Sequence, residues 1–351
     1  MKKTFRLIRL SISTICLLLS PILNSQNFKR IDSLLSLKYS KDAPGAVFLI
    51  SKHGKIVYEK AFGLSNLELD TPMKTNSVFE IGSMTKQFTA VSILLLVEQG
   101  KISLKDEITK FIPNYPTSGH KITIHHLLTH TSGIKSLHKI ALKDLSPNKL
   151  IDFFKDESMD FAPGEKFKYN NSGYIILGYI IEKVSGLNYA NFVREYIFKK
   201  LHMNSSYYAN QKQIIPQRAS GYHFRKNYIN RRPISYTIPY SSGSLMSTVA
   251  DMNLWQIAIK NYILISKQTA QLAFKNYTLN NGKHINYGYG WHIKTTNTIK
   301  RIEHGGSIFG FKSMGIYLPE NDIYVIGLTN CDCNSPTKIS KEIAAIASEN
   351  Y

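Results

Sequence analysis

The stretch Phe79-Glu80-Ile81-Gly82-Ser83-Met84-Thr85-Lys86 runs into the apolar segment 90–97, and together they predict a turn that opens a buried helix. If the helix begins near Ser83, Lys86 lies one turn further along the same face, because residues three apart on a helix are neighbours. A hydroxyl and an amine then meet beside a helix N-terminus, whose free N–H groups and dipole stabilise negative charge. A serine nucleophile benefits from both. An N-capping serine followed by a solvated lysine produces the same string, so the rest of the chain must decide between them.

The first 25 residues have the features of a secretory signal peptide. Cations and no acidic residue precede an apolar run over 10–19, and Pro21 and the small Ser25 follow it. The run is shorter than the roughly 20 residues that a membrane-spanning helix needs, so we expect no stable membrane anchor. Cys16 follows the bulky Ile15, which does not fit a lipid-attachment site. We therefore predict a signal peptide over 1–25 and export to the periplasm or the cell exterior.

The chain is strongly basic, with a formal net charge of +20 over 351 residues. Its cations are scattered rather than gathered into a basic stripe with interleaved aromatic residues, and the leader directs the protein away from nucleic acid, so nucleic acid is not an expected partner. Anionic polymers of the cell envelope fit the charge and the address better. A lysine-rich and asparagine-rich composition without functional meaning accounts for the charge equally well.

Cysteine and histidine patterns predict neither a disulfide framework nor a metal site. Cys331 and Cys333 are separated by one residue, which makes them poor candidates for a mutual bridge, and they are too few to hold a metal. His125, His126 and His130 lie close together without an accompanying carboxylate or cysteine, in a segment whose leucines indicate a buried helix turn. We expect no metal and no cofactor.

Periodicity places strands at both ends of the chain and helices between them. Alternating residues predict a hairpin over 46–58 that turns at His53-Gly54. Apolar residues recur at helical spacing in three central segments, 174–184, 189–201 and 248–259. Strand patterns return in the last part, at 289–294, 300–303, 313–318 and 324–329, before an amphipathic helix over 337–348.

These elements predict an α+β fold with one antiparallel sheet built from both chain ends and flanked by helices. A second, mainly helical lobe would lie beside the sheet, with a cleft between them. The length after the leader fits one domain over 26–351. Within it we expect a sheet lobe from 26–104 and 274–351, and a helical lobe from 105–273.

Three further clusters accompany Ser83 and Lys86 in the sequence. They are Leu127-Leu128-Thr129-His130-Thr131-Ser132-Gly133, the turn-rich segment 163–174 with Tyr169-Asn170-Asn171, and His304-Gly305-Gly306-Ser307 at the end of a predicted strand. In this order they resemble the serine β-lactamase and penicillin-binding peptidase superfamily, in particular the branch of class C β-lactamases, D,D-carboxypeptidases, D-aminopeptidases and related esterases. The resemblance spans nearly all of the chain after the leader and implies a β-lactamase/transpeptidase-like fold.

The resemblance implies a role for each residue of the first two motifs. Ser83 corresponds to the acylated nucleophile and Lys86 to its activating partner, while Tyr169 and Asn171 match the family's Y-x-N. A tyrosine acts as a base only if nearby positive charge favours its phenolate, and Lys86 could supply that charge. The amide of Asn171 can hold the lysine amine with its oxygen and the substrate with its NH₂ group. The segment with His130 is expected to be structural, shaping the helical lobe behind the site.

His304 stands where β-lactamases usually carry the lysine of K-T-G. Gly305 and Gly306 would let the strand approach the substrate, and the backbone N–H groups of Ser307 and Ser83 would form an oxyanion hole. A lysine at this position attracts a carboxylate, whereas His304 is largely neutral unless its pKa rises. The sequence therefore gives little support for efficient hydrolysis of penicillins.

The expected function is an exported, metal-independent serine hydrolase that forms an acyl-enzyme at Ser83. Its substrate would be a small molecule or peptide, for example a cell-wall fragment, with an amide, β-lactam or ester carbonyl, and a D,D-peptidase or esterase is the favoured assignment. The alternative is a penicillin-recognising binding or sensor protein that is acylated without turnover; Tyr169 and Asn171 are intact, which argues against it. The oligomeric state cannot be inferred from the sequence.

Overall fold

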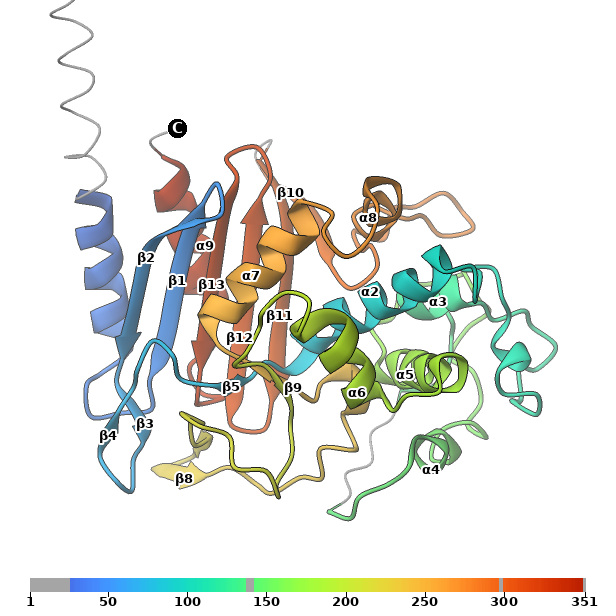
Figure 1. Cartoon of the computed structure of the whole chain (residues 1–351), viewed down its shortest axis with the longest axis horizontal. Coiled ribbons are helices and arrows are strands. Elements are labelled where there is room, and N and C mark those ends of the chain that lie inside the picture. The colour runs from blue at the N-terminus through green and yellow to red at the C-terminus, as the bar shows by residue number, and fades with distance from the viewer. Residues whose placement is uncertain (1–25, 137–141, 297–298, 350–351) are drawn as a thin grey trace, which may run out of the picture.

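A computed structural model describes residues 26–136, 142–296 and 299–349 (Figure 1). The expected signal peptide over 1–25 lies outside the described residues. The main sheet is antiparallel with the strand order β10-β11-β12-β13-β1-β2, so β1 and β13, the first and last of its six strands in sequence, are neighbours. The six strands are β1 (Ala46–Lys52), β2 (Lys55–Phe62), β10 (His292–Thr296), β11 (Ile299–Ile308), β12 (Phe311–Leu318) and β13 (Ile323–Thr329). The predicted α+β fold with a sheet from both chain ends is confirmed.

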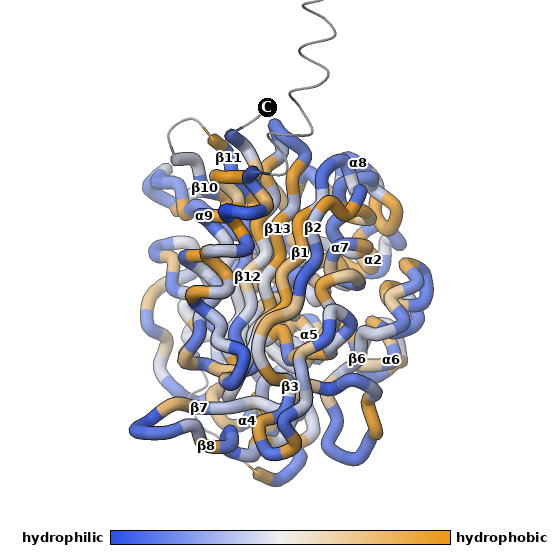
Figure 2. The backbone as a smooth tube through the Cα atoms, turned by 90° about the vertical axis from the view of Figure 1, so that its left-hand side faces the viewer, coloured by the Kyte–Doolittle hydropathy of each residue, from blue (hydrophilic) through white to orange (hydrophobic). Residues whose placement is uncertain are grey.

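Both faces of this sheet are covered, which explains why β13 is apolar and buried along its whole length. Successive residues of β1 point to opposite sides. Phe48 and Ile50 pack with the helix over residues 26–38 and with α9 (Thr337–Ser348). Val47 and Leu49 face the larger core, and α7 (Val249–Lys260) contacts β1 and β13. Figure 2 shows the hydrophobic central strands between these helical layers.

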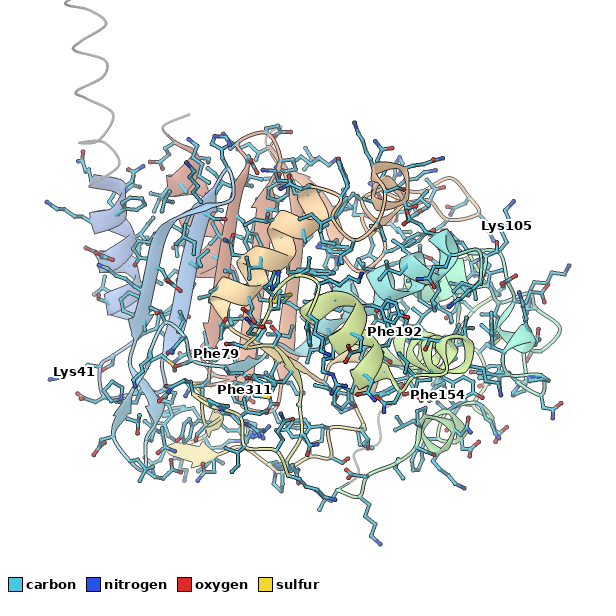
Figure 3. All side chains as sticks on the ribbon, viewed as in Figure 1. Lys41, Phe79, Lys105, Phe154, Phe192 and Phe311 are labelled. Carbon is cyan, nitrogen blue, oxygen red and sulfur yellow. A yellow bond between two sulfur atoms is a disulfide. The ribbon has the colours of Figure 1, made fainter. Side chains whose placement is uncertain are left out.

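The remaining helices lie to one side of the sheet (Figure 1). They are α2 (Thr85–Glu98), α3 (Ile124–Leu128), α4 (Pro147–Asp152), α5 (Asn171–Ser185), α6 (Tyr189–Val193) and α8 (Lys267–Ala273). A π-helical turn over Arg194–Phe198 extends α6. The side chains of Phe154 and Phe192 lie among these helices, whereas Phe79 and Phe311 lie near the lower end of the sheet (Figure 3). α7 also comes from the range 105–273 but covers the sheet.

Short strands connect the sheet to the helices. β3 (Leu64–Asn66) pairs with β4 (Thr71–Pro72), and β7 (Tyr222–Phe224) pairs with β8 (Tyr228–Asn230). β9 (Leu245–Ser247) lies between β5 (Phe79–Glu80) and β6 (Tyr207–Tyr208). β5 leads directly into the turn that carries Ser83, so this small sheet fixes the point at which the chain enters α2.

The strand that carries His304 is longer than predicted. We expected a strand over 300–303 with His304 at its end, but β11 continues to Ile308 because β12 pairs with it through this whole region. β10 pairs with β11 only as far as Glu303. Residues 304–308 therefore form part of a strand whose β10 side is not occupied by a described strand.

The prediction that Cys331 and Cys333 are not bridged is wrong, because the structure joins them by a disulfide. The chain turns directly after β13, which brings the two Cα atoms to 5.1 Å, within the range that a disulfide spans. The short sequence separation was misleading because a tight turn, unlike an extended segment, can bring such residues together. No helix of the described residues has the length and apolar character needed to cross a membrane.

Candidate active site

Ser83 and Lys86 meet as the sequence predicts. Ser83 lies in a 3₁₀ turn over Gly82–Met84 that leads into α2, and its Oγ is 3.2 Å from Lys86 Nζ. Lys86 is completely buried. Its amine also donates to Asn171 Oδ1 at 2.8 Å and to the carbonyl oxygen of Ser242 at 2.9 Å. The amine is thus held by three oxygen atoms from three different segments of the chain.

The burial of Lys86 favours a neutral amine, which can accept a proton. Burial lowers the pKa of Lys86 to about 7. A neutral amine has two N–H bonds and one lone pair, and the oxygens of Asn171 and Ser242 can only accept hydrogen bonds. When both N–H bonds point to these two oxygens, the lone pair faces the hydroxyl of Ser83. The geometry is that of a base placed beside a nucleophile.

Tyr169 reaches the site because its loop is closed by the cap of α5. The side chain of Asn170 accepts a hydrogen bond from the backbone N–H of Gly173 at 3.0 Å, which starts the helix and fixes the residues on either side. Burial raises the pKa of Tyr169, and a hydrogen bond with Ser83 opposes this shift. The phenolate considered from the sequence is therefore disfavoured, because the effect of burial on Tyr169 outweighs that of the hydrogen bond.

His130 packs against the ring of Tyr169 and binds the backbone on both sides of it, a role that the sequence did not predict. Its Nδ1 accepts the backbone N–H of Asn170 at 3.0 Å, and its carbonyl oxygen accepts the backbone N–H of Lys168 at 3.0 Å. Its ring lies 4.3 Å from the ring of Tyr169, measured between centroids. Burial lowers the pKa of His130 well below its ordinary value, so the ring is neutral. The histidine holds the backbone on both sides of Tyr169.

The neighbouring histidines make ordinary structural contacts. His125 Nδ1 is 2.8 Å from the hydroxyl of Tyr289, and His126 completes the N-terminal cap of α3 with Thr123. Among the residues that the structure describes, no group of three or more His, Cys, Asp or Glu side chains is placed to hold a metal ion.

β11 approaches the Ser83 turn through a glycine. A Cβ atom at Gly306 would lie 2.0 Å from the carbonyl oxygen of Ile81, so no larger residue fits without movement of the backbone. A Cβ atom at Gly82 would in turn lie 2.8 Å from the backbone nitrogen of Ser307. The Ser307 nitrogen is therefore next to the Gly82-Ser83 peptide, as two donors of one oxyanion hole require.

His304 is buried and held in one tautomer. Its Nδ1 lies 2.6 Å from the carbonyl oxygen of Gly305, which can only accept, so Nδ1 carries the proton. Nε2 is then an acceptor for the hydroxyl of Tyr287 at 3.2 Å and that of Tyr169 at 3.5 Å. Burial, with the charges of His292 and Lys86, lowers the pKa of His304 well below its ordinary value. The ring is neutral and does not replace the charge of a lysine.

One pocket of about 430 Å³ collects most of the predicted residues. Six of them line it, namely Ser83, Tyr169, His304, Gly305, Gly306 and Ser307. Lys86 and Asn171 join this group through their contacts with Ser83. The eight residues predicted from three separate stretches of sequence therefore form one site.

A buried ion network anchors the strand that leads into the site. Glu80 is 1 % exposed, and its Oε1 lies 2.7 Å from Arg231 and 3.5 Å from Arg218. The hydroxyl of Tyr236 donates to the same carboxylate at 2.6 Å. Because Glu80 precedes Ser83 by three residues, these contacts tie the nucleophile turn to the segment 218–236.

Comparison with known proteins assigns the chain to a family. A family model described as Beta-lactamase matches residues 28–347. The chain belongs to the β-lactamase family. It is 31 % identical to Penicillin-binding protein 4* of Bacillus subtilis (strain 168), over 86 % of this chain and 71 % of that protein. Further curated relatives, from Staphylococcus aureus, are 27–28 % identical, and the chain spans only 66 % of their length.

Solved structures of similar proteins support the same family assignment. The octameric penicillin-binding protein homologue from Pyrococcus abyssi is 31 % identical, covers 91 % of this chain and 76 % of its own, and superimposes with a TM-score of 0.80. A D-amino acid amidase from Ochrobactrum anthropi SV3 has a TM-score of 0.79 at 21 % identity, with 92 % and 98 % of the two chains covered, and shows the fold alone. As a β-lactamase family member, the protein is related to serine hydrolases and penicillin-binding proteins.

Three contacts of this β-lactamase-family site could not be assigned from sequence. Ser242 contributes a backbone oxygen, and a backbone oxygen cannot be recognised from the residue type. Tyr287 is one of 21 tyrosines and stands outside every motif. His130 belongs to a motif, but its contact with Tyr169 depends on the fold.

The close approach at Gly306 leads to a testable difference between neighbouring glycines. Gly306→Ala is expected to destabilise the protein by about 1–3 kcal/mol, the usual cost of overpacking, and to weaken activity by displacing Ser307. In Gly305→Ala the new Cβ lies no closer than 3.3 Å to its neighbours, so a smaller cost is expected. Thermal unfolding and hydrolysis rates of the two variants test this; equal losses would contradict the geometry.

Proposed function

We propose that the protein is an exported serine hydrolase that cleaves an amide or ester bond through a Ser83 acyl-enzyme, most readily as a D,D-peptidase or esterase. The observation that carries the proposal is the buried Lys86, whose amine contacts Ser83, Asn171 and the Ser242 carbonyl. A buried amine without a carboxylate partner costs stability, and such costs are typical of functional sites. Family membership supports the same chemistry.

In the acylation step, Ser83 Oγ attacks the substrate carbonyl carbon and its proton passes to the lone pair of Lys86. The oxyanion accepts hydrogen bonds from the backbone N–H groups of Ser83 and Ser307. When the bond to the leaving group breaks, the proton returns from Lys86 to the leaving nitrogen or oxygen by way of the Tyr169 hydroxyl. A protonated Tyr169 suits this donor role, consistent with its raised pKa.

Hydrolysis of the acyl-enzyme runs through the same groups in reverse order. Water takes the place of the leaving group, gives its proton through Tyr169 to Lys86, and attacks the ester carbonyl. Collapse of the second oxyanion releases the acid, and Ser83 regains a proton from Lys86. No metal or cofactor takes part in these steps.

Intact-mass spectrometry separates this proposal from an acylated sensor. The purified protein is mixed in parallel with a penicillin, a D-Ala-D-Ala peptide and a p-nitrophenyl ester, and both protein mass and product are followed. Product release with at most a transient adduct on Ser83 supports the hydrolase. A persistent adduct without product would instead indicate a penicillin-recognising binding protein. If no probe gave an adduct or a product, both assignments would be contradicted.

The pH dependence of kcat/KM follows from Lys86. Because the neutral amine is the base and its pKa is about 7, activity is expected to fall below pH 7 and to level off above it. Asn171→Asp places a carboxylate beside the amine, which favours the ammonium form and raises its pKa by about 1–3 units. The acid limb should move upward by the same amount. If the acid limb of the pH profile does not move, it reports the titration of a group other than Lys86.

A further inference from the structure

The pocket that contains Ser83 extends onto a strongly basic surface. Lys294 of β10, Lys312 of β12 and Lys341 of α9 line the same cavity of about 430 Å³ as the nucleophile. Among the described lining residues, Glu303 is the single carboxylate. The sheet order brings these lysines together from segments that are far apart in the sequence.

Glu303 cannot balance this charge. The carboxylate is 2 % exposed and is shared by three cations, with Lys294 at 2.8 Å, Arg301 at 3.4 Å and Lys341 at 4.0 Å. One negative charge therefore faces three positive charges before Lys312 is included. A pocket with such an excess attracts an anion.

Lys312 contacts a residue of the proposed oxyanion hole. It lies opposite Ser307 in the pairing of β11 with β12, and its Nζ is 2.7 Å from Ser307 Oγ. Within the described residues no carboxylate lies within ion-pair distance of Lys312. Since the Ser307 nitrogen adjoins the Gly82-Ser83 peptide, an anion at Lys312 would lie close to the scissile carbonyl.

The histidines of the pocket do not supply this charge. Burial lowers the pKa of His292 to about 4, and the pKa of His304 is also well below its ordinary value. Lys294 contributes to both shifts. Near neutral pH the positive charge of the pocket therefore resides on the lysines.

We propose that Lys312, assisted by Lys294 and Lys341, forms a subsite for an anionic group of the substrate, a carboxylate or a phosphate close to the bond that is cleaved. The inference rests on the proposed acyl-enzyme function and names the substrate class of that site. In this proposal the anion is recognised by lysines of β12, β10 and α9 and not by the side chain at position 304.

Aryl boronic acids test the subsite without knowledge of the natural substrate, because the serine oxygen of a hydrolase adds to boron. Isothermal titration calorimetry compares phenylboronic acid with its 3-carboxy and 3-phosphono derivatives on the full chain. We expect the anionic compounds to bind about tenfold more tightly, with an advantage that decreases at high salt. In Lys312→Gln the affinity ratio should fall towards one, and Lys312→Arg should restore it. The derivative with the larger Lys312-dependent gain identifies the preferred anion.

Lys338→Gln is the matched control, because Lys338 is on α9 like Lys341 but its side chain is 93 % exposed and does not line the pocket. This variant should keep the wild-type affinity ratio. Equal affinity of neutral and anionic boronates for the wild type, or a ratio that survives in Lys312→Gln, would overturn the subsite while the acyl-enzyme proposal stands. If no boronate binds, or if binding persists in Ser83→Ala, the proposed function itself fails and the subsite with it.

Discussion

Ser83→Ala is expected to lower kcat by about 10⁴-fold or more for every substrate that the wild-type protein hydrolyses, the scale seen when a serine hydrolase loses its nucleophile. The loss should be this large because no other described hydroxyl takes its position 3.2 Å from the amine of Lys86. The variant should fold normally, since Ser83 is partly exposed and closes no helix cap. The measurement is the hydrolysis rate together with the mass of the protein after exposure to substrate.

Ser92→Ala provides the control for this prediction. Ser92 lies on the same helix and is fully buried, but its hydroxyl donates to the backbone oxygen of Phe88 and is remote from the pocket. Its replacement should change activity by no more than a few fold. If Ser83→Ala retained activity near that of Ser92→Ala, or still gained the mass of an acyl group, the nucleophile would be another residue.

Much of the fold was predictable because periodicity and position along the chain agree. The alternating pattern at 46–58 and the strand patterns after 287 become β1, β2 and the last four strands, and Thr248 caps the predicted helix that becomes α7. Ser83, Lys86, Tyr169 and Asn171 were predicted as site residues from short motifs, because the residue types and spacing within a motif can be read directly from the sequence. A motif of this kind lies within a few consecutive residues, so it can be recognised without knowledge of the fold.

The features that could not be predicted depend on contacts between segments that are far apart in the sequence. β11 extends past Glu303 because β12 pairs with it, although Gly305 and Gly306 have low strand propensity. Lys294, Lys312 and Lys341 are unremarkable in a lysine-rich sequence, and only the sheet order places them around one pocket. The same holds for the backbone oxygen of Ser242, which accepts a hydrogen bond from the amine of Lys86.

Lys86→Met is the second variant for which a large effect is expected, and it separates catalysis from stability. Loss of a general base costs about 10²–10⁴-fold in rate, so hydrolysis should nearly disappear. The pH dependence of folding should change as well. Burial lowers the pKa of Lys86 from 10.5 to about 7, so the unfolded chain binds a proton between these values that the folded protein lacks.

The sign of the stability effect follows from that difference in bound protons. In the wild type, the penalty for burying Lys86 is fully present below pH 7, diminishes as the pH rises, and vanishes above 10.5. Methionine does not titrate, so the variant lacks this dependence. The stability of Lys86→Met relative to the wild type, measured as the difference in the free energy of unfolding, should therefore be greater at pH 6 than at pH 9 by about 3 kcal/mol, at about 1.4 kcal/mol per pKa unit.

Denaturant titrations of the wild type, Lys86→Met and Ser83→Ala at both pH values measure this shift. Ser83→Ala should lose activity without gaining the relative stability at low pH, because it keeps the buried amine. A difference between Lys86→Met and the wild type that does not vary with pH would mean that Lys86 titrates alike in the folded and unfolded chain. Lys86 would then be an ammonium near neutral pH, and the proton of Ser83 would need a different acceptor.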